Sequence, residues 1–443
     1  MRVKTHECRG LRWLTPVLSV CCALSVCRAG PAEKGARATL VETFTLPRLS
    51  LSRFGNPECT EASLARAVTH GLKFTDLPSI GSGLARTGEN EFVGITDRGP
   101  NGTGGDDDGV HRTFPLPEFC PTIVRFKLLG GKIRITEFIP IRDAQGRRIS
   151  GLSNVEGEER LYESPGAAAP LALDENGIDP EAIRVLPDGK FLVSEEYSPS
   201  VLVIATNGQV LVRYTPASKR LSHAAYPVRP ILPDVFARRR ANKGFENLAL
   251  SPDGRTAFAL LQSPMGEDPR LGSSRIIRGV KLDVSNPLAA RVAGEYLFEE
   301  SDARDDSAKE RQSRVSWSDA ECIAPGRLLV LERAKGQVKL LDVNLSGATD
   351  ILNHPDEPGL KLEDPSTDLA ALKIAPARGR AIFSTREVPG ITSDKLEGLA
   401  VLNPTEIALS NDNDFGIGEN ETGEPSMVWI VRLSEPLPGG HGD

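Results

Sequence analysis

The feature that most constrains this fold is a phrase of two short apolar runs that returns along the chain. Each copy opens on an acidic residue, turns between the two runs, and closes with acidic residues. The clearest copy runs from Glu181 through Pro187-Asp188-Gly189 to Glu195-Glu196. A Pro-Asp-Gly segment presets a turn and supplies the positive φ that a hairpin needs. The phrase therefore predicts a recurring β-hairpin.

Further copies begin at Glu246, Asp319 and Glu397, at successive spacings of 65, 73 and 78 residues. An early strand over 92–96 ends in the same way, at Asp97. Hairpins at this spacing suit a radial stack of four-stranded blades with inserted loops or additional blades between copies. We therefore expect an all-β, β-propeller-like domain of about six blades, with five or seven also allowed. A β-sandwich array is the alternative, but it does not require an internal repeat.

The N-terminus has the pattern of a secretory signal peptide. Basic residues precede an uncharged run over 13–27, and Cys27-Arg28-Ala29 offers a cleavage site. We expect a secreted or periplasmic protein without a stable membrane span; an uncleaved anchor is the alternative, although a span normally needs about 20 apolar residues. The expected organisation is a signal peptide (1–29), a flexible N-terminal segment (30–45), the propeller domain (46–432) and a flexible C-terminal tail (433–443).

The charge of the chain excludes some classes of partner. There are 60 Asp and Glu against 53 Lys and Arg, for a net charge of −7, and the signal peptide carries away five basic residues and one acidic residue. An acidic surface repels phosphate backbones, so we expect no nucleic-acid partner. No G-x-S-x-G elbow, P-loop or dinucleotide fingerprint occurs. The sequence therefore contains no motif that indicates a catalytic serine nucleophile or a nucleotide-dependent reaction.

Three cysteines remain outside the signal peptide: Cys59, Cys120 and Cys322. They show no Cys/His metal spacing. In an oxidising compartment two of them can pair, and Cys59 with Cys120 is the first expectation. Three buried free thiols are the equal alternative.

Carboxylates stand at the same point of every copy of the repeat. The innermost strands of a propeller line a central channel, so equivalent side chains meet near one axis. Their mutual repulsion raises pKa values, and a bound divalent cation relieves it. Oxygen ligands without Cys or His favour Ca²⁺ or Mg²⁺ over Zn²⁺, with Ca²⁺ as the first expectation. The expected metal ligands are Glu181, Glu246, Asp319, Glu397 and Asp412.

Other acids close the second strand of the hairpin, and basic side chains lie beside them. The candidates for proton transfer are Asp97, Glu195, Glu196 and Glu332. A guanidinium beside a metal can hold a phosphate bidentately. The candidate substrate-binding residues are Arg98, Tyr197, Arg333 and Arg386. For each of these residues the alternative is a structural role, as a turn cap or in a pair between blades.

Several longer phrases run in order over roughly residues 45–432. They are Ile95-Thr96-Asp97-Arg98-Gly99-Pro100-Asn101, Gly177-Ile178-Asp179-Pro180-Glu181, Glu195-Glu196-Tyr197-Ser198-Pro199-Ser200, Asn242-Lys243-Gly244-Phe245-Glu246-Asn247-Leu248, Leu331-Glu332-Arg333, Lys395-Leu396-Glu397-Gly398-Leu399 and Asn411-Asp412-Asn413-Asp414-Phe415-Gly416. Together they resemble the esterase-like phytase family. The resemblance implies a propeller-like fold, export, and a phosphoester-cleaving activity at clustered Glu and Asp. Ala182, Asn247 and Ser198 stand where that family usually has Gly, which alters the margin of the expected site.

These observations predict an exported hydrolase that cleaves a small-molecule phosphoester with the help of a metal ion at an acidic cluster on the propeller axis. Two other classes stay open. One is a non-catalytic ligand-binding propeller whose acidic ring is structural, and the other is a Ca²⁺-dependent lactonase-type carboxyl esterase. We expect a monomer.

Overall fold

The computed structural model describes residues 37–54, 59–106, 109–154, 159–266, 268–306, 310–357, 359–418 and 422–439. The signal peptide expected over 1–29 lies outside these residues. The described chain is all-β, with 24 strands and two α-helices, α1 (Glu61–Thr69) and α2 (Ala303–Asp306). Among the described residues, no helix has the length and apolar character needed to cross a membrane.

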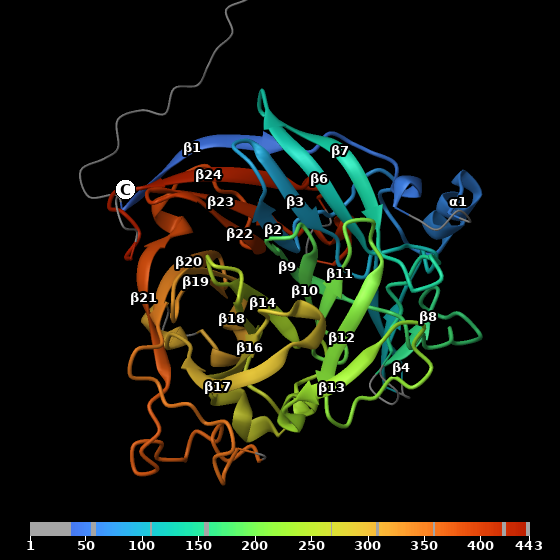
Figure 1. The fold of residues 1–443 in the computed structure, drawn as a ribbon. Coiled ribbons are helices and arrows are strands. Elements are labelled where there is room, and N and C mark those ends of the chain that lie inside the picture. The colour runs from blue at the N-terminus through green and yellow to red at the C-terminus, as the bar shows by residue number, and fades with distance from the viewer. Residues whose placement is uncertain are drawn as a thin grey trace, which may run out of the picture.

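Most strands belong to four-stranded groups arranged around one axis (Figure 1). The first group contains β2 (Gly83–Arg86), β3 (Glu91–Ile95), β6 (Thr122–Leu129) and β7 (Lys132–Pro140). The second contains β9 (Pro180–Val185), β10 (Phe191–Glu195), β11 (Ser200–Ile204) and β12 (Val210–Pro216), with β13 (Val228–Leu232) added at its outer edge. The third contains β14 (Phe245–Leu250), β15 (Thr256–Leu261), β16 (Ile276–Asp283) and β17 (Arg291–Glu299).

The fourth group contains β18 (Ser316–Ala324), β19 (Arg327–Ala334), β20 (Gln337–Asn344) and β21 (Ala377–Ser384). The fifth contains β22 (Leu396–Asn403), β23 (Glu406–Asn411), β24 (Met427–Leu433) and β1 (Ala38–Thr45). The first strand of each group touches the first strand of the next, in the order β2, β9, β14, β18, β22 and back to β2. This closed ring of inner strands has the architecture of a β-propeller.

The described residues make five such blades, where the sequence spacing predicted about six and also allowed five. The additional length between copies of the hairpin forms loops and small accessory elements instead of another blade. One is a separate three-stranded sheet of β4 (Gly102–Asp106), β5 (Gly109–Thr113) and β8 (Arg160–Tyr162). Another is the segment 345–376, which contains no strand or helix among its described residues.

The predicted hairpins form around the expected turns. Strands β9 and β10 pair in antiparallel fashion, with Phe191 opposite Val185. Gly189, which ends the Pro-Asp-Gly turn between them, has φ +84°, and Gly254 in the next copy has φ +70°. Such angles strain residues that carry a Cβ, so glycine at this place fixes where each hairpin turns.

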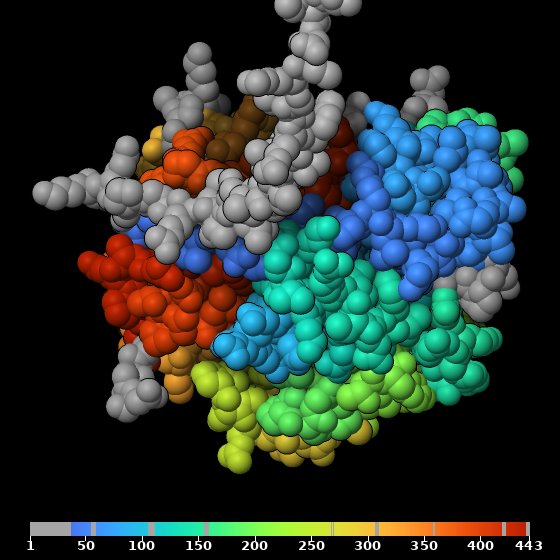
Figure 2. All heavy atoms as spheres, turned by 90° about the horizontal axis from the view of Figure 1, so that it is seen from above, coloured from blue at the N-terminus to red at the C-terminus, as the bar shows by residue number. Residues whose placement is uncertain are grey.

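The ring is closed by the two ends of the chain. Strand β1 pairs with β24, with Ala38 opposite Leu433 and Thr45 opposite Met427. In Figure 2 the blue N-terminal segment lies against the red C-terminal blade. The expectation of a flexible segment over 30–45 is therefore wrong for residues 38–45, because their partner strand is distant in the sequence and no local pattern reveals it. The expected flexible tail likewise contains a packed residue, Leu437, which is buried and donates its N–H to the carbonyl of Pro404.

The three cysteines are free and buried, which is the second of the two alternatives considered for them. Burial raises the pKa of the Cys120 thiol to about 12 and those of Cys59 and Cys322 to about 11. Thiols of this kind are unreactive and act as small apolar side chains.

Candidate functional site

A cavity of about 170 Å³, the axial cavity, lies where the inner strands begin. It is lined by seven carboxylates, five cationic side chains and three amides. These are Asp97, Arg98, Asn101, Arg112, Glu181, Glu196, Asn242, Lys243, Glu246, Gln262, Arg333, Lys395, Glu397, Asp412 and Asp414. Eight of the thirteen site residues expected from the sequence are among them. The repeat brings them together because each copy contributes an inner strand to the ring.

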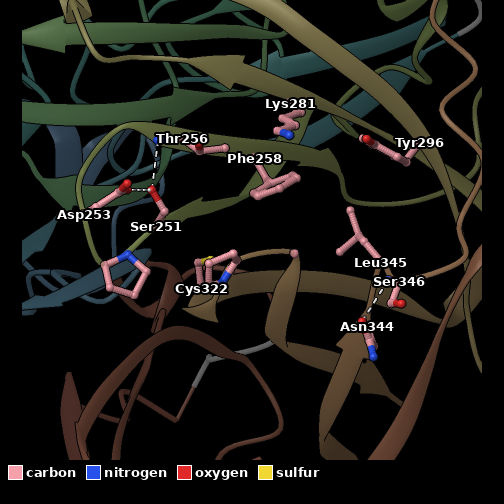
Figure 3. A pocket seen from close by; sticks show the side chains of 13 residues that line it. Ser251, Asp253, Thr256, Phe258, Lys281, Tyr296, Cys322, Asn344, Leu345 and Ser346 are labelled. Atoms are coloured by element: carbon pink, nitrogen blue, oxygen red, sulfur yellow. Dashed lines mark hydrogen bonds between the residues drawn. The ribbon is translucent and has the colours of Figure 1, made fainter. Parts of the chain in front are cut away.

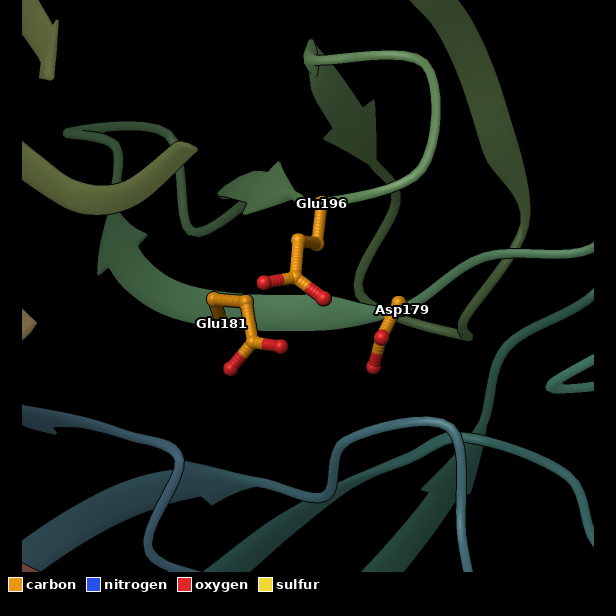
Figure 4. Close-up of side chains that lie close together, drawn as sticks. All are labelled: Asp179, Glu181 and Glu196. Atoms are coloured by element: carbon orange, nitrogen blue, oxygen red, sulfur yellow. The ribbon is translucent and has the colours of Figure 1, made fainter. Parts of the chain in front are cut away.

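Two of the lining residues, Glu181 and Glu196, belong to a cluster of three acids at the second blade. Oxygen atoms of Asp179, Glu181 and Glu196 lie within 4.8 Å of one another (Figure 4). Asp179 and Glu181 stand at the start of β9, and Glu196 directly follows β10. Burial and the neighbouring carboxylates raise the pKa of Glu181 well above its usual range. This buried acidic cluster has the oxygen donors that a divalent cation requires.

Arg98 holds one side of this cluster. Its Nε lies 2.8 Å from Asp179 Oδ2, and its backbone N–H donates to Asp179 Oδ1 at 3.0 Å. Its Nη2 lies 3.3 Å from Glu196 Oε2 and also donates to Asn242. The Arg98 side chain is only 5% exposed. Arg98 is therefore a fixed part of the wall, beside the carboxylates of Glu181 and Glu196 that also line the cavity.

Glu246 adds an acceptor that the described residues leave unsatisfied. Its Oε1 accepts a hydrogen bond from the Gln262 amide, but its buried Oε2 has no hydrogen-bond partner among the described residues. Burial and the charges of Glu196 and Glu397 raise the pKa of Glu246 well above its usual range. A buried, unpaired carboxylate oxygen is costly, so this atom fits a site completed by a cation.

The opposite wall, at the fifth blade, consists of ion pairs. Lys395 Nζ donates to both Asp412 and Asp414, and Arg333 Nη1 donates to Glu397. Although burial opposes it, Lys395 lowers the pKa of Asp412. Burial raises the pKa of Glu397 to about 7 against the pull of Lys395 and Arg333. The axial cavity therefore has an acidic side at β9 and β14 and a mixed side at β22.

The other five expected site residues lie outside the cavity lining. Glu195 pairs with Arg213 inside the second blade, where both side chains are 0% exposed. Glu332 accepts hydrogen bonds from Trp317 Nε1 at 3.0 Å and from the Ser301 N–H at 2.9 Å. Each of these two acids therefore has a structural environment.

Tyr197 is buried behind Arg98, and its hydroxyl donates to the carbonyl of Gly151 at 2.5 Å. Asp319 pairs at 2.8 Å with the buried Arg184 and so does not reach the cavity. Arg386 donates to backbone carbonyls of Lys335 and Gly336 at the surface.

Sequence reasoning missed several residues that line the cavity or, like Asp179, lie directly behind its wall. Asp179, Lys243, Lys395 and Asp414 all stand inside the family phrases but received no role. Their position in the sequence could have identified them, because each lies close to one of the repeated acids. The separation is two residues in every case except Lys243, which lies three residues before Glu246. Arg112 comes from the accessory sheet, and no repeat indicated it.

A larger cavity of about 480 Å³ is lined by residues of the third and fourth blades (Figure 3). Phe258, Lys281 and Tyr296 line it, together with the turn at Ser251–Asp253. The carboxylate of Asp253, its one acidic residue, accepts a hydrogen bond of 2.6 Å from the Ser251 hydroxyl. This larger cavity lacks the clustered acidic and basic side chains of the axial cavity.

Fold and cavity together define a β-propeller with an acidic site on its axis. A profile of the phytase-like family, described as "esterase-like activity of phytase", matches residues 79–415. The chain belongs to this phytase-like family. The resemblance found in the sequence is thereby confirmed.

A curated relative, an "uncharacterized secreted protein" of Arthroderma benhamiae, is 27% identical over 175 residues. The match spans 35% of this chain and only 34% of that protein. Among solved structures, a calcium-binding regucalcin from Agrobacterium tumefaciens aligns over 82% of this chain and 94% of its own, at 11% identity and a TM-score of 0.35. The periplasmic gluconolactonase PpgL of Pseudomonas aeruginosa aligns over 83% and 89%, at 12% identity and a TM-score of 0.30. Likenesses this low transfer neither ligand nor reaction.

Proposed function

We propose that this protein is an exported, monomeric hydrolase that cleaves a small-molecule phosphoester in the axial cavity with the help of a divalent cation. The observation that supports it is the composition of that cavity, about 170 Å³ in volume, in which seven carboxylates and five cationic side chains line one small space. Carboxylates suit a cation, and the cationic side chains suit the phosphate that the cation would share.

Glu181, Glu196 and Glu246 are the residues that would hold the cation, with Ca²⁺ preferred over Mg²⁺. The first two contribute oxygens within one cluster, and Glu246 contributes Oε2, which has no hydrogen-bond partner within the described ranges. A bound cation would supply charge neutralisation and polarisation of a phosphoryl oxygen. Asp319 is not among these ligands, because its carboxylate is paired with Arg184.

The remaining cavity residues would bind the substrate and move a proton. Arg333 and Lys243 face the cavity as phosphate-binding cations. Glu397, with a pKa of about 7, can take a proton from an attacking water near neutral pH. Arg98, already held by Asp179, would position Glu196.

The test is calorimetric binding of Ca²⁺ and Mg²⁺ to the protein, followed in the same sample by hydrolysis of a phosphomonoester, a phosphodiester and a lactone. We expect cation binding and phosphoester turnover, with Glu181→Gln weakening the first and Glu397→Gln slowing the second. Glu406→Gln, which removes a surface pair with Arg432, serves as the control. Cation binding with lactone turnover alone would assign the protein to the carboxyl esterases.

A non-catalytic ligand-binding propeller is the second candidate. The ion pairs of Lys395 with Asp412 and of Arg333 with Glu397 favour it, because paired charges at an axis also serve as structure. Absence of turnover of all three substrates, in a protein that still binds phosphate, would support this candidate.

A further inference from the structure

The axial cavity is too small for a whole substrate of ordinary size. Its volume of about 170 Å³ lies below the range of about 300–1,000 Å³ that is typical of small-molecule sites. One small group of a substrate fits, and the rest must extend beyond the mouth. Two residues of the cavity wall, Lys243 and Arg333, also line a second cavity of about 410 Å³. The two cavities are therefore adjacent.

This second cavity, the cationic cleft, is formed where loops of the third, fourth and fifth blades meet. Its lining contains four cationic side chains, Lys243, Arg314, Arg333 and Lys335, and a single carboxylate, Asp394. The Asp394 carboxylate accepts a hydrogen bond of 3.2 Å from the N–H of Gly336. Arg314 is half exposed, and its one ion pair among the described residues is a long one, with 3.7 Å between Nη1 and Glu310 Oε1. The cleft thus carries an excess of positive charge beside a cavity rich in carboxylates.

Two buried donors in the lining of the cationic cleft lack partners among the described residues. Ser263 is 4% exposed, and its hydroxyl has no hydrogen-bond partner among the described residues. The Nε of Arg333 is likewise buried and unpartnered within the described chain. Buried donors without acceptors cost free energy and call for an explanation. An oxyanion in the cleft would provide acceptors for both.

We propose that the cationic cleft binds a second anionic group of the substrate, a phosphate or a carboxylate, while the axial cavity receives the ester that is cleaved. This inference rests on the proposed function. It defines the substrate class as small esters with two anionic groups, because Lys243 and Arg333 link the two sites.

The experiment measures, by calorimetry on the Ca²⁺-loaded protein, the affinities for glucose 6-phosphate, glucose 1,6-bisphosphate and 6-phosphogluconate. The second anion is absent in the first, a phosphate in the second and a carboxylate in the third. We expect at least one two-anion compound to bind about tenfold more tightly than glucose 6-phosphate. Two exposed ion pairs at up to about fivefold each account for this factor. Which compound shows the preference decides between phosphate and carboxylate.

The double variant Arg314→Ala/Lys335→Ala should abolish this preference, because both side chains line the cleft and neither lines the axial cavity. Arg220→Ala/Arg255→Ala removes two exposed cations elsewhere and should retain it. A wild-type protein without preference, one that binds none of the three compounds, or a preference that survives in the cleft variant would overturn the inference. A preference without hydrolysis of any compound would instead overturn the proposed function and leave the cleft as an anion site.

Ser263→Ala provides an independent check. Because the described part of the chain offers this hydroxyl no hydrogen-bond partner to lose, the urea midpoint should stay the same or rise, while the preference for the second anion falls about threefold. A lower midpoint with unchanged affinity would show that the hydroxyl is structural and would contradict its assignment to the site.

Discussion

Replacing Asp319 by Asn should destabilise the protein strongly, because Asp319 neutralises an arginine buried across the axis. Arg184 of β9 places Nη2 2.8 Å from Asp319 Oδ1 of β18, and these side chains are 3% and 0% exposed. These strands are not neighbours in the ring of inner strands. Nη1 of Arg184 donates to the Leu84 carbonyl of β2, and Asp319 Oδ2 accepts from the Leu399 N–H of β22. One ion pair therefore joins four blades.

The magnitude follows from what remains around Arg184. Removing one partner of a buried pair usually costs about 3–5 kcal/mol, because the other charge stays buried. Here Glu321 keeps an oxygen 2.9 Å from Arg184 Nε. We therefore expect a loss at the lower end, about 3 kcal/mol. Glu406→Gln, at the surface pair with Arg432, should cost less than about 1 kcal/mol.

The assay is equilibrium urea unfolding followed by the fluorescence of the buried Trp317 and Trp429. It belongs at pH 8, because burial raises the pKa of Asp319 to about 7 and the carboxylate must be ionised. A loss for Asp319→Asn no larger than that for Glu406→Gln would refute the reasoning. Glu321→Gln added to Asp319→Asn should increase the loss, because it removes the remaining charge partner.

Glu181→Gln and Glu246→Gln should each weaken Ca²⁺ binding at least tenfold, measured by calorimetry, since both side chains line the axial cavity. An unchanged affinity would exclude the altered residue as a ligand. Burial raises the pKa of Glu295 to about 7, so between about pH 4.5 and 7 the folded state binds more protons than the unfolded state and stability falls as pH rises. Glu295→Gln should flatten that fall, by about 3 kcal/mol in urea unfolding; an unaltered pH profile would argue against this carboxyl. Iodoacetamide at pH 8 should leave the native thiols unmodified and alkylate them after unfolding, as mass spectrometry would show for Cys59, Cys120 and Cys322.

The local parts of this fold could be predicted because their signals are local. Turns such as Pro187-Asp188-Gly189 combine fixed residue types with apolar runs on both sides, and the structure has a hairpin there. The blade count depended on how the residues between hairpins are used. A loop and a strand differ little in the polar segment 345–376, so spacing alone suggested more blades than the described chain forms.

The candidate site, too, could be predicted only in part from the sequence. Glu181, Glu246 and Glu397 could be found because equivalent points of a repeat meet at the axis. Position in the repeat does not reveal a partner, however. Asp319 has the same place in its copy as Glu246, but Arg184 comes from a different blade to meet it. Whether an acid is free or paired is settled by contacts between blades, which a single sequence does not display.

The pairing of β1 with β24 has a consequence for how the molecule is made. The fifth blade needs Ala38–Thr45 and also Met427–Leu433, which is synthesised long after it. Such a contact spans nearly the whole chain, and loops of that length close slowly. The earlier blades can form as the chain emerges, but the circle stays open until β24 has been made. A chain that lacks either β1 or β24 would therefore remain an open arc with an unpaired edge strand.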